Sequence, residues 1–70
     1  MSKKKQAANK MYDGIAAEAA GLYGFAEAAF DEAAWLFREA GAAKDAAMRH
    51  GFEIAVDSAR RCAAALEDRA

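Results

Sequence analysis

The fold is decided by residues 11–37, which read MYDGIAAEAAGLYGFAEAAFDEAAWLF. Projected at about 100° per residue, the period of an α-helix, most of their apolar side chains fall in one arc. This arc contains Met11, Ile15, Ala19, Leu22, Phe25, Ala26, Ala29, Phe30, Ala33, Leu36 and Phe37. Because the phase does not slip across Gly21-Leu22-Tyr23-Gly24, the pattern predicts one long helix from about residue 7 to about residue 40.

The two glycines inside this stretch leave an alternative open. Gly21 and Gly24 each cost up to about 1 kcal/mol in a helix interior, so a bend or a break between them is the other reading of the pattern. A break would give antiparallel helices over residues 7–20 and 25–40. The protein would then be a compact three-helix bundle.

A further helix is predicted over residues 43–68, after Gly41 ends the preceding element. Its apolar positions recur at spacings of 4, 3, 4, 3 and 4, which is typical of an antiparallel helix seam. They are Met48, Phe52, Ala55, Ala59, Cys62 and Leu66. Gly51 is a second point at which this helix could divide.

The composition supports an all-α fold. Alanine supplies 22 of the 70 residues, and proline and threonine are absent, so little in the chain competes with helix formation. We therefore predict a small antiparallel helical bundle. It is either a long helical hairpin or a bundle of three to four helices if the chain breaks at Gly21–Gly24 and Gly51.

The apolar arc of residues 11–37 covers roughly 160°, which is wider than one partner helix can bury. We therefore expect this part of the chain to pack against more than one helix. Two arrangements would do this. The chain could fold back at Gly21–Gly24, or two copies could form a homodimeric four-helix bundle.

Charge is distributed unevenly along the chain. Residues 1–10 hold four lysines and no acid, and residues 11–37 hold five acids and no base. We expect residues 1–6 to form a basic flexible tail and residues 7–70 a single helical domain. No run of apolar residues reaches the length of a signal peptide or a membrane span, so we expect a cytoplasmic protein. The bias toward alanine, arginine, glycine, aspartate and glutamate suggests a GC-rich bacterial or phage genome, and hence a bacterial host cell.

The polar side of the long predicted helix carries the candidate partner-binding residues. Trp35 falls in the middle of that side, out of phase with the apolar arc, and exposed tryptophans are frequent binding hot spots. Asp13, Glu27 and Asp31 fall within a stripe about 40° wide, with Glu32 and Glu39 beside it. Such a stripe can imitate a row of phosphates or can be an ordinary solvated face.

Residue types that carry chemistry are scarce. The only histidine, His50, has no second copy of a Glu/His metal motif, and Cys62 falls on the apolar seam. No glycine-rich phosphate loop or catalytic triad is present. We therefore expect a protein that is not an enzyme and that has no cofactor or metal. Direct nucleic-acid binding is not expected either, because no recognition motif accompanies the lysines.

In size, in lacking chemistry and in its acidic helical surface, the chain resembles the small phage and mobile-element proteins that inhibit type I CRISPR systems, the anti-CRISPR proteins. This resemblance implies binding to a Cascade-like surveillance complex. The protein would block target DNA by steric occlusion or by acidic DNA mimicry. The alternative function is a self-associating structural or adaptor module, whose exposed arc forms a dimer.

Overall fold

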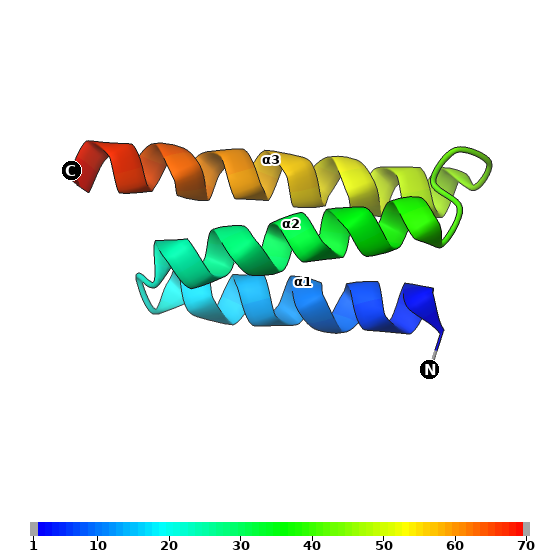
Figure 1. The fold of residues 1–70 in the computed structure, drawn as a ribbon, viewed down its shortest axis with the longest axis horizontal. Coiled ribbons are helices and arrows are strands. Elements are labelled where there is room, and N and C mark those ends of the chain that lie inside the picture. The colour runs from blue at the N-terminus through cyan, green and yellow to red at the C-terminus, as the bar shows by residue number, and fades with distance from the viewer. Residues whose placement is uncertain (1, 70) are drawn as a thin grey trace.

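The computed structural model describes residues 2–69, which form three α-helices joined by short turns. The helices are α1 (Lys3–Ala19), α2 (Tyr23–Glu39) and α3 (Ala46–Arg69). Each helix runs antiparallel to the one before it (Figure 1). No strand occurs within residues 2–69, so the prediction of a small all-α bundle is confirmed. None of these helices is both long and apolar enough to cross a membrane.

Side-chain caps fix where α1 and α3 begin. The Ser2 hydroxyl accepts a hydrogen bond from the Lys5 amide at 3.2 Å, and an Asp45 carboxylate oxygen accepts one from the Ala47 amide at 2.8 Å. The predicted helix start at residue 7 was therefore wrong. Residues 3–6, which the sequence pattern assigned to a flexible tail, form the first turn of α1.

The break between α1 and α2 occurs at Gly21, so the prediction of one long helix was wrong and the three-helix alternative holds. Gly21 has a φ of +77°, a conformation that glycine adopts without steric cost. Its amide donates to the Glu18 carbonyl at 3.0 Å, and the Leu22 amide donates to the Ala17 carbonyl at 2.8 Å. This double closure is a Schellman motif, and it satisfies carbonyls that a helix end otherwise leaves unpaired.

The end of α2 repeats this arrangement. Gly41 has a φ of +114°, and its amide donates to the Arg38 carbonyl at 3.1 Å. The prediction that Gly41 ends the preceding helix is confirmed. Gly51, by contrast, does not divide α3, which continues without interruption to Arg69.

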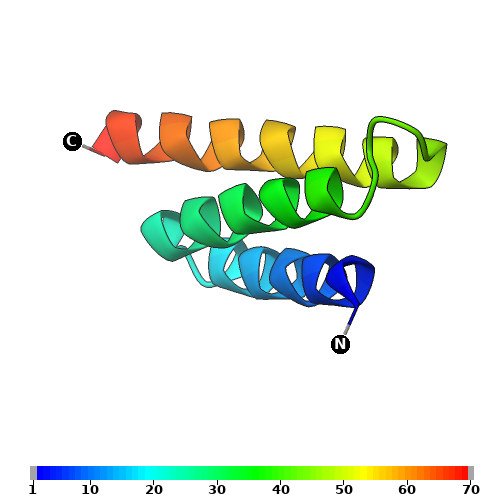
Figure 2. The ribbon, with the colours of Figure 1, turned by 45° about the vertical axis from the view of Figure 1, so that its right-hand side comes forward.

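Helix α2 lies between α1 and α3, as two views of the ribbon show (Figures 1 and 2). Glycines let two buried rings of α2 approach the flanking helices closely. A Cβ atom added at Gly14 of α1 would lie 2.7 Å from the Phe30 ring. One added at Gly51 of α3 would lie 2.6 Å from the Phe37 ring. Gly51 therefore serves as a packing position and not as a helix break.

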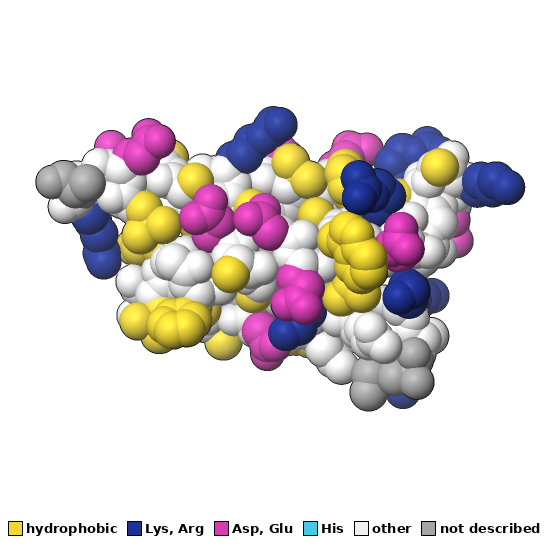
Figure 3. Space-filling model, viewed as in Figure 1, with side chains coloured by type: hydrophobic (Ala, Val, Ile, Leu, Met, Phe, Trp, Pro, Cys, Tyr) yellow, Lys and Arg dark blue, Asp and Glu magenta, His cyan; other side chains and the backbone are white. Residues whose placement is uncertain are grey.

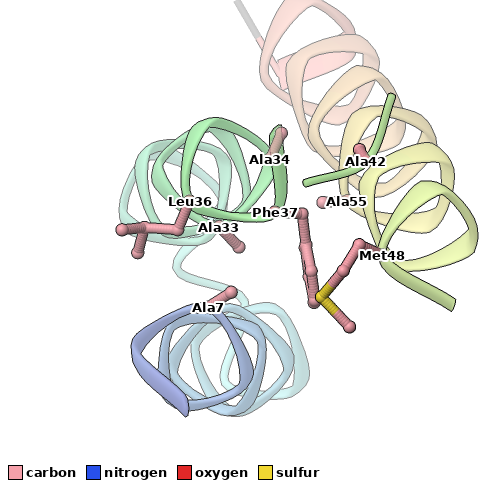
Figure 4. Packing of buried hydrophobic residues seen from close by; sticks show 8 residues of the cluster. All are labelled: Ala7, Ala33, Ala34, Leu36, Phe37, Ala42, Met48 and Ala55. Atoms are coloured by element: carbon pink, nitrogen blue, oxygen red, sulfur yellow. The ribbon is translucent and has the colours of Figure 1, made fainter. Parts of the chain in front are cut away.

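The core consists of two groups of buried side chains. The first joins all three helices, and in it Phe37 and Met48 point toward each other (Figure 4). The second contains Ala26, Phe30, Ala59 and Cys62. The burial of Cys62 agrees with its place on the predicted seam. Because α2 packs on both α1 and α3, the predicted packing of the first half against more than one helix is achieved by folding back.

Candidate functional site

The candidate site lies on the side of α2 that faces away from the core. Ala26, Phe30, Ala33 and Phe37 are buried on the opposite side of this helix. At 100° per residue, the residues about half a turn away from these four project outward, whereas Ala34 and Leu36 at the flanks are buried. Asp31, Glu32, Trp35 and Glu39 are exposed on this side, and Glu27 lies half-buried at its edge toward α3, so the side holds five of the six predicted partner-binding residues. We call this side, together with the α1 residues beside it, the outer face.

Helix α1 contributes to the outer face through two lysines. The Lys10 ammonium lies 3.2 Å from a carboxylate oxygen of Glu32, and the Lys3 ammonium lies 5.3 Å from the centre of the Trp35 ring. Asp13 stands one turn beyond Lys10 on the same side of α1. The structure therefore brings the six predicted residues together from two antiparallel helices, not from one.

The outer face carries an excess of negative charge. Figure 3 shows acidic side chains along its middle, with hydrophobic side chains on either side of them. Of its five carboxylates, only Glu32 forms an ion pair within residues 2–69. Asp31 and Glu39 are exposed and have no ion pair within residues 2–69, so a basic partner could reach them without breaking one.

Trp35 is 47% exposed, which is high for so large an apolar side chain. Lys3 covers part of the ring through a cation–π contact, which contributes about 0.5–1 kcal/mol at an exposed site. The rest of the ring is free for a partner. Sequence reasoning missed both Lys3 and Lys10 as members of this surface because they meet α2 only when α1 folds back along it.

A second surface feature is an apolar hollow of about 580 Å³ at the turn between α1 and α2. Its lining residues are Gly21, Leu22, Tyr23, Gly24, Phe25, Ala28 and Leu66. The Arg69 guanidinium lies 4.7 Å from the centre of the Tyr23 ring at its edge.

The side chains of Leu22 and Phe25 were expected in the apolar arc of a long helix. They are exposed instead, at the turn between α1 and α2 and in the first turn of α2. The signal that could have found this is the glycine pair itself.

A pair of charged side chains ties α1 to α3. The Arg61 guanidinium donates two hydrogen bonds to the Glu18 carboxylate, at 2.6 and 2.7 Å. These bonds lower the pKa of Glu18 and raise the pKa of Arg61. Burial, together with the nearby Glu18 charge, raises the pKa of the Cys62 thiol. A buried thiol with a raised pKa is a poor nucleophile, so we assign no chemistry to Cys62.

The Glu18–Arg61 pair makes the stability of the fold depend on pH. The pKa of Glu18 is lowered on folding, so the pair stabilises the protein fully above the ordinary glutamate pKa of 4.5. This contribution is lost as the pH falls below 4.5 and through the lowered pKa. Glu18→Gln should therefore reduce the Tm at pH 7 by a few degrees, since a partly exposed pair contributes up to about 1 kcal/mol.

Thermal melting followed by circular dichroism at pH 7 and at pH values well below 4.5 tests this. The Tm difference between the wild type and Glu18→Gln should close in acid. Arg61→Gln should follow the same course. A difference that stays constant across this range would show that the ionised pair does not contribute to stability.

Residues 2–69 contain no group of three or more histidine, cysteine, aspartate or glutamate side chains that could hold a metal ion. His50 is exposed on α3. No protein-family model, curated protein or solved structure is similar enough to the chain to match it.

Proposed function

We propose that this protein is a non-enzymatic inhibitor that binds a protein or nucleoprotein complex through its outer face. The observation that carries the proposal is the half-exposed Trp35 set among five carboxylates, of which only Glu32 has an ion-pair partner within residues 2–69. A large aromatic side chain surrounded by charge is a frequent centre of binding energy at protein interfaces. The resemblance to anti-CRISPR proteins suggests a type I surveillance complex, of the Cascade kind, as the target.

The charges of the outer face suit a surface that normally binds DNA. Such surfaces are lined with lysine and arginine, which attract Asp31, Glu39 and neighbouring carboxylates over distances of about 10 Å at moderate salt. Trp35 would then supply the short-range contact. The inhibitor would occupy the path of the target DNA and keep the complex from engaging it.

Steric occlusion and DNA mimicry make different demands on the charges of the outer face. Mimicry of DNA requires a row of like charges, whereas the outer face also contains Lys3 and Lys10. This mixture supports steric occlusion centred on Trp35 over mimicry of a phosphate row. Steric occlusion should be less sensitive to salt than mimicry, because fewer ion pairs form on binding.

The function is tested by phage plaquing on a bacterium with an active type I CRISPR system. Expression of the protein should restore plaques of a phage that the system targets, and an empty vector should not. A phage without a targeted sequence controls for effects on growth. Failure to restore plaques against several type I subtypes would contradict the proposal.

A further inference from the structure

We infer that the outward side of α1 packs against the same side of a second copy of this chain, antiparallel and about a two-fold axis. This surface differs from the outer face, so the inference does not rest on the proposed function. It concerns residues that the three-helix fold leaves uncovered.

Helix α1 has two lengthwise rows of residues with helix-packing spacing. The row of Ala7, Met11, Gly14 and Glu18 has spacings of 4, 3 and 4 and faces α2 and α3. A second row, Lys5, Ala8, Tyr12, Ile15 and Ala19, has spacings of 3, 4, 3 and 4 and faces outward. We call this second row the α1 seam. Four of its five residues are apolar, and apolar residues at this spacing are typical of a helix-packing interface.

The two large side chains of the α1 seam are well exposed. Tyr12 is 71% exposed and Ile15 is 53% exposed, although isoleucine is among the residue types most often buried. They stand next to each other on the seam, one turn apart, with Ala8 before them and Ala19 after them. The apolar patch therefore runs along the middle of α1.

The order of sizes along the seam is symmetric, which suits a second copy of the same chain. An interface about a two-fold axis must be complementary to itself. If the axis passes between Tyr12 and Ile15, Tyr12 of each copy lies against Ile15 of the other. Ala8 then lies against Ala19 of the second copy. Large side chains fill the centre, and alanines on both sides let the helices approach closely.

The charges of α1 favour the same arrangement. Its first turn holds Lys3, Lys4 and Lys5, whereas the partial positive charge of a helix N-terminus favours acids there. Lys3 contacts Trp35, but the side chains of Lys4 and Lys5 have no partner within residues 2–69. An antiparallel second α1 would place its C-terminal carbonyl end beside these two lysines. The partial negative charge of that end would stabilise them.

The size of the seam sets the strength of the dimer. Stable protein complexes bury about 800 Å² on each partner. A seam of about four helical turns on one helix offers less than that. We therefore expect a dimer whose population rises with concentration in the micromolar range or above, and not a permanent one.

Sedimentation velocity at a series of concentrations tests the surface. The wild type should shift from monomer to dimer as the concentration rises. Ile15→Lys should raise the dimer Kd about tenfold or more, because it places a charge in the centre of the seam. Ile54→Lys is the matched control, since Ile54 is 41% exposed on α3, and it should dimerise like the wild type.

Circular dichroism checks that each variant is folded. A wild type that stays monomeric at every concentration would overturn the inference. An equal effect of Ile54→Lys and Ile15→Lys would overturn it too.

Disulfide cross-linking tests the antiparallel register. Chains carrying Ala8→Cys and Ala19→Cys should form a cross-linked heterodimer when they are mixed and oxidised, because these positions face each other. Ala8→Cys alone should cross-link far more slowly, since its two copies would lie about 16 Å apart along the helices. The native Cys62 is buried, and the wild-type chain gives the background level of cross-linking through it. Faster cross-linking of Ala8→Cys with itself would contradict the antiparallel register.

Discussion

Replacing Phe30 by alanine should cost most of the stability of the protein. Phe30 is fully buried and is the largest side chain with no exposure at all. It projects from α2 onto the backbone of α1 at Gly14 and contributes to the core group that contains Ala59 and Cys62 of α3. Truncation of a buried phenylalanine costs about 3–5 kcal/mol. A chain of this length has only about 4–10 kcal/mol of stability in all.

Urea denaturation followed by far-ultraviolet circular dichroism measures this effect. Phe25→Ala is the matched control, because Phe25 lies on the same helix and is 73% exposed. It should change the free energy of unfolding by no more than about 0.5 kcal/mol. Similar losses in the two variants would contradict the placement of α2 between α1 and α3.

Adding one methyl group at Gly14 should destabilise the protein, although alanine is a better helix former than glycine. The added Cβ would lie 2.7 Å from Cε1 of Phe30, so this fully buried ring would have to shift against the residues packed around it. Overpacking of this kind costs about 1–3 kcal/mol. It outweighs the gain of about 1 kcal/mol or less from helix propensity.

Gly24→Ala is a control that should change the free energy of unfolding in the opposite direction. Gly24 lies in the first turn of α2, and an added Cβ there would meet no atom within 4 Å. Only the helix-propensity term remains, so this variant should be more stable than the wild type by up to about 1 kcal/mol. Stabilisation by Gly14→Ala, measured in the same urea titration, would show that the α1–α2 contact is looser than described.

The helical class and the seam of α3 could be predicted because both depend on local properties. Alanine favours helix at every position it occupies, and the apolar spacing of α3 is that of one uninterrupted face. The break at Gly21 could not be fixed by periodicity. The apolar positions on both sides of Gly21 follow the same helical period, and this periodicity does not show whether the chain continues straight or reverses. Gly21, with its positive φ, permits the chain reversal that ends α1, and Ile15 and Phe25 are exposed in the resulting three-helix bundle.

The part of the candidate site that lies within one helix was predictable, and the part that depends on contacts between helices was not. The outward positions of Asp31, Glu32 and Trp35 follow from their place within one helix. The contacts of Lys3 and Lys10 with that helix depend on α1 lying antiparallel to it, more than twenty residues away along the chain. No spacing rule within a single helix contains that information. A capped first turn, with Ser2 as its cap, was the local signal that the lysines are helical.

We propose the outer face as the surface that binds the partner. This proposal is tested most directly by measuring whether the purified protein displaces target DNA from a purified type I surveillance complex. The wild type should do so. The triple variant Asp31→Lys, Glu32→Lys and Trp35→Ala should not, while remaining helical.

The matched control is the triple variant Glu53→Lys, Asp57→Lys and Ile54→Ala. It makes the same change of charge and removes an exposed apolar side chain on α3. It should inhibit like the wild type. If the outer-face variant displaced DNA as well as the wild type does, the outer face would not be the binding surface.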